Sequence, residues 1–210
     1  MTTPAPEPGA SLARALERLR AGEPVVVATE TVYGVACDAR NETAVQAVFA
    51  LKGRPETNPL PVLVADVAAA RSLADPWPAV ADRLAQAFWP GALTIVVPLG
   101  AELAPSVTRG HGSLALRCPD HPIARMLAES FAGPLALTSA NRSREPGART
   151  EDEARAFVRD AGRSDIIVLS GGAASGGVVS TIVRVVGERE DVEILRHGAV
   201  GEDEILAALQ

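Results

Sequence analysis

The chain has 210 residues, of which 47% are hydrophobic and 22% are charged, and its net charge is −6. This length and composition can build one substantial core, so we expect a single domain over 11–210 after a flexible tail over 1–10. The acidic balance argues against a broad surface that coats nucleic acid, but it leaves room for a local basic cleft.

Nothing in the sequence indicates secretion or a membrane. Residues 1–9 lack a cationic segment followed by an apolar one, and no later apolar run is long enough to span a bilayer. Cys37 and Cys118 are far apart, each inside an apolar stretch, which is typical of buried free thiols. We therefore expect a soluble, cytoplasmic protein without a membrane partner.

Hydrophobic periodicity predicts alternating helices and strands in the first half of the chain. Ser11 can cap a helix that ends at Gly22, and Asn41 can cap a helix that ends at Leu51. Between these helices, Val25 to Ala28 reads as a buried strand. The other elements predicted here are a strand over 61–65, a short helix capped by Asp66, and a helix over 80–88.

β-prone runs dominate the second half. Those near Leu93, Ser113 and Val178 lack the crossover helices that a fully parallel sheet requires. The remaining elements are a helix over 122–131, strands over 135–137, 166–169 and 194–196, a helix opened by the capping box of Thr150 and Glu153, and a helix over 202–209. We predict an α/β fold: one domain with a twisted mixed parallel and antiparallel sheet, helices packed around it, and a concave basic cleft.

Several predicted strands end in hydroxyls, amides or arginines, and ligands of α/β sheets usually bind at strand ends. Arginine offers a planar fork that matches carboxylate and phosphate, while Ser, Thr and Asn fix orientation. Each such residue alone is equally an ordinary turn or surface residue, but together they favour an anionic ligand. The set comprises Thr29, Glu30, Thr31, Arg117, Ser139, Asn141, Ser180, Thr181 and Arg196.

The segment 52–60 is a charged loop between two apolar elements. Pro55 and Pro59 restrict the backbone, so we expect a rigid, non-helical loop in which Lys52 and Arg54 project to the same side. A solvent-facing loop is the alternative reading. The polar strand ends favour a role in anion binding instead.

Other chemistries lack their motifs. The glycine-rich run 171–177 has no Walker lysine, no G-x-G-x-x-G follows a strand, and there is no G-x-S-x-G. His111, His121 and His197 do not have the spacing of metal ligands. We therefore expect neither a protein nucleophile nor a metal bound by protein side chains.

The combination and order of the motifs resemble the YrdC/TsaC family, in its short, single-domain form. The motifs are Thr29-Glu30-Thr31-Val32-Tyr33-Gly34, Lys52-Gly53-Arg54-Pro55, Asn58-Pro59-Leu60, Trp89-Pro90-Gly91, Arg117-Cys118-Pro119, Ser139-Ala140-Asn141, Ser180-Thr181-Ile182 and Leu195-Arg196-His197-Gly198. The resemblance implies a nucleotidyltransferase that condenses L-threonine, bicarbonate and ATP to threonylcarbamoyl-AMP and pyrophosphate. Partner proteins would then transfer the threonylcarbamoyl group to tRNA, so that contact of this chain with tRNA is indirect or weak.

The resemblance also implies residue roles. Lys52 and Arg54 would be catalytic, holding phosphates and the carbamate. The nucleotide would contact Arg54, Asn58, Ser113, Asn141, Thr150 and Arg196, and the threonine and carbamate would contact Thr31, Lys52, Arg117, Ser139 and Ser180. Mg²⁺ would bind through the phosphates of ATP, with no organic cofactor.

The sequence departs from the family pattern at three places. Leu63 stands where the family usually has a histidine, Ser143-Arg144 opens a longer loop before Thr150, and Ala28 replaces the customary proline before Thr29. Two alternatives therefore remain: a paralogue that acts on another carbamoyl or amino-acid substrate, and an RNA-binding module without turnover. The net charge of −6 argues against tight non-specific RNA binding.

Overall fold

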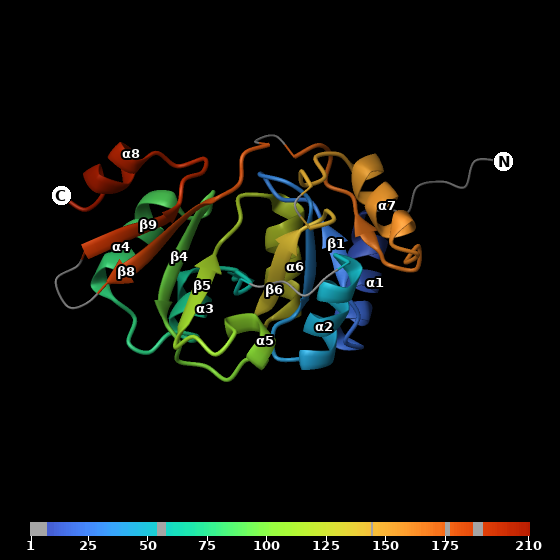
Figure 1. Ribbon diagram of the computed structural model, residues 1–210, viewed down its shortest axis with the longest axis horizontal. Coiled ribbons are helices and arrows are strands. Elements are labelled where there is room, and N and C mark those ends of the chain that lie inside the picture. The colour runs from blue at the N-terminus through green and yellow to red at the C-terminus, as the bar shows by residue number, and fades with distance from the viewer. Residues whose placement is uncertain (1–7, 54–57, 144, 175–176, 187–190) are drawn as a thin grey trace.

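A computed structural model describes residues 8–53, 58–143, 145–174, 177–186 and 191–210, which form an α/β fold (Figure 1). Nine strands form one sheet in the order β7-β1-β2-β6-β3-β5-β4-β8-β9. The strands are β1 (Val25–Val27), β2 (Gly34–Asp38), β3 (Val62–Leu63), β4 (Leu93–Pro98), β5 (Ser113–Arg117), β6 (Leu135–Ser139), β7 (Val168–Leu169), β8 (Thr181–Val186) and β9 (Asp191–Arg196). The helices are α1 (Pro8–Arg20), α2 (Glu42–Leu51), α3 (Val67–Arg71), α4 (Ala79–Phe88), α5 (Pro105–Thr108), α6 (Pro122–Phe131), α7 (Glu151–Asp160) and α8 (Glu202–Ala207).

The sheet is mixed, which confirms the predicted fold class. Strand β4 pairs antiparallel with β5 and parallel with β8, and β3 pairs parallel with β5 and antiparallel with β6. Figure 1 shows β8, β9 and α8 at one end of the molecule, and β1, α1 and α7 at the other. Strands β3 to β6 therefore lie in the middle of the sheet, between the two ends.

Three of the four predicted helix caps, Asn41, Asp66 and Thr150, are confirmed. Asn41 accepts a hydrogen bond from the backbone of Ala44 at the start of α2, and Thr150 and Glu153 form the capping box of α7. Helix α1 begins at Pro8, three residues before the predicted cap Ser11. The division into a tail and a domain stays a prediction, because residues 1–7 lie outside the described ranges.

The structure adds two elements to the predicted set, β2 and α5, and shortens several of the predicted strands. β2 pairs antiparallel with β1 from Val27 opposite Gly34 onward, so the polar motif over 29–33 is the loop of this hairpin. β3 and β7 have only two residues each. The flanking apolar residues of β3, Leu60 and Val64, are buried without ladder pairing, so hydrophobicity alone overestimates strand length here.

One hydrophobic core joins the sheet to its helices, and it includes side chains from α1 to α8. Both cysteines are buried and free, as predicted. Burial raises the pKa of the Cys37 thiol to about 12, so the thiol form predominates at neutral pH. Among the residues that the structure describes, no helix is both long and apolar enough to cross a membrane.

Candidate functional site

A cavity of about 670 Å³ lies on one face of the sheet. Along three strands its lining residues are alternate ones: Thr94 and Val96 on β4, Ser113, Ala115 and Arg117 on β5, and Ile182 and Arg184 on β8. Successive side chains of a strand point to opposite faces, so this spacing places the cavity on a single face. None of the described lining residues lies within a helix. The sequence predicted a site at strand ends, whereas the cavity extends along the strands.

Of the eleven predicted site residues, nine line this cavity: Thr31, Lys52, Asn58, Ser113, Arg117, Ser139, Asn141, Ser180 and Arg196. Arg54 lies outside the described residues. Thr150 is not among the described lining residues, and its hydroxyl accepts a hydrogen bond from Glu153 N at the start of α7. The individual roles, including the nucleotide contact of Thr150, stay predictions.

Lys52 is the C-cap of α2 and is only 4% exposed. Its Nζ donates to the carbonyl of Ser139 and to Oδ1 of Asn141, both at 2.9 Å. The Ser139 hydroxyl donates to the same Oδ1 at 2.6 Å. The predicted alternative of a solvent-facing lysine is therefore wrong for Lys52, because its ammonium is buried among the polar groups that follow β6.

Arg117, at the end of β5, is the most buried cation of the site after Lys52. Its Nη2 donates to Oε1 of Glu30 at 2.5 Å and to Oγ1 of Thr31 at 3.3 Å, and its Nε donates to the carbonyl of Gly91 at 3.2 Å. The side chains of Arg117 and Glu30 are 7% and 15% exposed. The strand end thus presents a nearly buried, fully positioned guanidinium to the cavity.

Arg196 is held by Ser180, which precedes β8. Its Nε and Nη2 donate to the Ser180 carbonyl at 3.1 and 2.7 Å, and Nη2 also reaches the Ser180 hydroxyl at 3.0 Å. Burial, with a smaller contribution from the nearby charge of Arg117, lowers the pKa of Arg196. Two arginines therefore share one part of the cavity.

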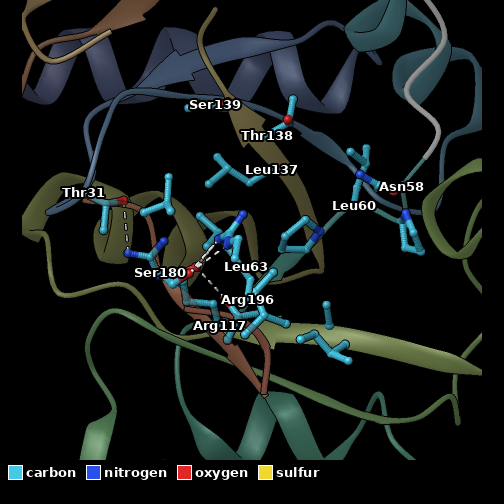
Figure 2. A pocket seen from close by; sticks show the side chains of 18 of the residues that line it. Thr31, Asn58, Leu60, Leu63, Arg117, Leu137, Thr138, Ser139, Ser180 and Arg196 are labelled. Atoms are coloured by element: carbon cyan, nitrogen blue, oxygen red, sulfur yellow. Dashed lines mark hydrogen bonds between the residues drawn. The ribbon is translucent and has the colours of Figure 1, made fainter. Parts of the chain in front are cut away.

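Figure 2 shows that the cavity has two distinct sides. Thr31, Arg117, Ser180 and Arg196 lie together on one side, and Asn58 and Leu60 lie on the other. Leu63 and Leu137 lie between them and form an apolar part of the wall. Arg196, predicted from the resemblance to contact the nucleotide, is thus bonded to a residue predicted for the threonine side.

The charges of the described lining residues all have one sign. Lys52, Arg117, Arg184 and Arg196 are cationic, and no Asp or Glu lines the cavity in the described part of the chain. Hydroxyl and amide side chains supply the remaining polar groups. Such a lining suits an anionic ligand. The predicted concave basic cleft stays a prediction.

Sequence reasoning missed Thr94 and Arg184 as contributors to the site. Thr94, in the middle of β4, hydrogen bonds the Ser180 hydroxyl at 2.9 Å. Arg184 lines the cavity and pairs with Glu193 across β8 and β9. Both lie inside β-prone runs, where only the pairing register shows which face a side chain occupies. Glu30 was included among the polar strand ends, but nothing in the sequence linked it to Arg117.

The described residues contain no group of three or more His, Cys, Asp or Glu side chains that could hold a metal ion. Fold and cavity therefore define an α/β protein with a cation-lined pocket on the open face of its sheet, suited to anions. The family model described as "Telomere recombination" (Sua5/YciO/YrdC) matches residues 17–198. The chain belongs to the Sua5/YciO/YrdC family.

Relatives and solved structures agree with this membership. The chain is 38% identical to the threonylcarbamoyl-AMP synthase of Bacillus subtilis over 94% of its own length and 56% of that protein. It is 39% identical to that of Halorhodospira halophila, over 68% of this chain and 75% of that protein. The structure of Pyrococcus abyssi Sua5 complexed with L-threonine superimposes with a TM-score of 0.88 and 33% identity, over 98% of this chain and 59% of that one.

The alignment lengths differ among these relatives. The chain spans little more than half of the Bacillus subtilis and Pyrococcus abyssi proteins. The structure of Escherichia coli YciO has a TM-score of 0.81 with 19% identity, over 96% of this chain and 95% of that one. At that identity the likeness concerns the fold, which both chains share over nearly their whole length.

Proposed function

We propose that this chain is a threonylcarbamoyl-AMP synthase that condenses L-threonine, bicarbonate and ATP to threonylcarbamoyl-AMP and pyrophosphate. The observation that carries the proposal is the convergence of nine predicted site residues on one cation-lined cavity. The names of the relatives and the threonine bound to the Pyrococcus abyssi protein support it. The product would be consumed by proteins that transfer the threonylcarbamoyl group to tRNA.

The chemistry requires two steps. The amine of threonine attacks the carbon of bicarbonate, and water leaves to give a carbamate. A carbamate oxygen then attacks the α-phosphorus of ATP, and pyrophosphate leaves. Neither step needs a protein nucleophile, so catalysis can rest on positioning and on stabilisation of negative charge.

The arrangement of the cavity supports a division of these tasks. Arg117 would bind the carboxylate of the amino acid, with Thr31 and Ser180 beside it. Lys52, between Ser139 and Asn141, would hold the carbamate and the phosphates, together with Arg54. Asn58 and Ser113 would bind the nucleotide on the other side. Mg²⁺ would travel with the phosphates, because the described lining offers no carboxylate to bind it.

Pyrophosphate release tests the proposal directly. We expect the purified chain to release pyrophosphate only when ATP, bicarbonate and L-threonine are all present, with threonylcarbamoyl-AMP detected by mass spectrometry. Omission of each substrate in turn is the control. Release that continues at an unchanged rate without threonine would contradict the amino-acid assignment.

Leu63 is the observation that favours a second candidate, a relative that acts on a different amino acid. Its side chain is fully buried in the cavity wall, and β3 pairs Leu63 with Arg117. An apolar wall discriminates poorly between isosteres, by only about a hundredfold. The same assay with valine, which is isosteric with threonine, and with serine separates the candidates. A clear preference for threonine excludes the second.

A further inference from the structure

The hydrogen bonds of Arg117 leave one part of its guanidinium unused. A guanidinium has five N–H donors. Nε and Nη2 donate to Gly91, Glu30 and Thr31, whereas Nη1 has no hydrogen bond to any residue that the structure describes. Arg117 lines the cavity, whereas Glu30 is not among the described lining residues. One edge of the guanidinium is therefore fixed by the protein, and the other end remains for a ligand.

The hairpin loop between β1 and β2 fixes the position of Glu30. Within it, Oγ1 of Thr29 accepts from the backbone N–H groups of Thr31 and Val32, at 3.2 and 3.3 Å, and donates to the Val32 carbonyl at 2.6 Å. These bonds close a tight turn around Glu30. The carboxylate therefore approaches Arg117 from a constrained backbone.

Stability alone does not account for this ion pair. Buried ion pairs contribute little net stability, because removing both charges from water offsets their attraction. Oε2 of Glu30 is buried and has no hydrogen-bond partner among the described residues, which adds a further cost. The cost in stability of burying the Glu30 carboxylate therefore indicates a functional role for this residue.

Building on the proposed function, we propose that Glu30 is a positioning residue of the amino-acid subsite. Its Oε1 holds Nη2 of Arg117 while the Gly91 carbonyl holds Nε, so that Nη1 is presented to the carboxylate of the amino acid. The nearby cation Arg196 repels Arg117, as the lowered pKa of Arg196 also indicates. The hydrogen bond to Oε1 of Glu30 keeps the guanidinium in place against this repulsion. Glu30 thereby determines the affinity for the amino acid without touching it.

Two conservative substitutions at Glu30 separate the effect of its contact with Arg117 from the effect of its negative charge. Glu30→Asp keeps the charge but withdraws the carboxylate by one methylene group, and we expect the KM for threonine to rise about tenfold. Glu30→Gln keeps the length and an acceptor oxygen, so the KM for threonine should rise less than about threefold. The KM for ATP should be unchanged in both. Calorimetric titration of the full chain with L-threonine should show the same order of affinities.

Glu151→Asp is the matched control, because Glu151 pairs with Arg155 at the same 2.5 Å and does not line the cavity among the described residues. A wild-type KM for threonine in Glu30→Asp would overturn the role of Glu30. Equal impairment of Glu30→Gln, or a parallel rise in the KM for ATP, would overturn it as well. A wild-type chain without threonine-dependent turnover would instead overturn the proposed function itself.

Discussion

Lys52→Met is expected to lower the rate of pyrophosphate release by about a hundredfold or more, the usual loss when one preorganised stabiliser of transition-state charge is removed. Lys52 is 4% exposed, so its ammonium acts in a site from which water is largely excluded. Ser139 and Asn141 accept hydrogen bonds from the Lys52 ammonium, so its positive charge is already in position when the substrates bind. Methionine is also unbranched and only one atom shorter, and it removes the ammonium with its charge and its N–H donors.

The loss should reflect chemistry and not unfolding. Two described acceptors of the Lys52 ammonium keep another donor: the Ser139 hydroxyl for Oδ1 of Asn141, and the Asn141 backbone N–H for the Ser139 carbonyl. Neither of these two acceptors is left unpaired, so we expect the free energy of unfolding to change by less than about 2 kcal/mol. Urea denaturation measures this. Arg71→Met, which removes a cation outside the described lining, is the control for turnover.

The sequence offers a second measurement, because Lys52 is its only lysine. A reagent that acylates lysine therefore modifies Lys52 and the N-terminal amine alone, and mass spectrometry separates the two. We expect ATP to slow acylation of Lys52 and to leave the N-terminal amine unaffected. Acylation of Lys52 at the same rate with and without saturating ATP would contradict its role at the phosphates.

The two halves of the site differ in how far the sequence could predict them. Lys52, Ser139 and Asn141 follow predicted elements directly, which marked each of them as a site residue, although Lys52 and Ser139 are 87 residues apart. The pair of Glu30 and Arg117 also joins positions 87 residues apart, and the sequence assigned no role to Glu30. Its formation depends on how β1, β2 and β5 are arranged in one sheet, which no local pattern encodes.

The location of the cavity on the sheet face was unpredictable for a similar reason. The runs that form β4, β5 and β8 are β-prone on both faces, so hydrophobicity does not distinguish the buried face from the one that lines the cavity. Thr94 and Ser180 meet only because β4 and β8, distant in sequence, pair in parallel. Composition and the alternation of helix and strand patterns were enough to predict the fold class. The face of the sheet that carries the cavity depends on the strand order.

The largest effect on the amino-acid side is expected from loss of the Arg117 charge. Arg117→Met alone would leave Glu30 buried without its partner, which typically costs about 3–5 kcal/mol of stability. Combining it with Glu30→Gln removes both charges and avoids the cost of an unpaired buried carboxylate. In this double variant we expect kcat/KM for threonine to fall by about a hundredfold or more, because a buried charge-assisted contact to the carboxylate is lost.

The single variant Glu30→Gln is the matched reference, since it shares the neutral side chain at position 30 and keeps Arg117. ATP binding, measured by calorimetry without amino acid, should be the same in both, because Asn58 lies on the other side of the cavity (Figure 2) and Ser113 lies at the opposite end of β5 from Arg117. Threoninol, which lacks the carboxylate, should bind both variants equally weakly. If the double variant kept the kcat/KM of Glu30→Gln for threonine, the carboxylate would have to bind elsewhere, and Arg196, held by Ser180 on the same side, would be the next cation to test.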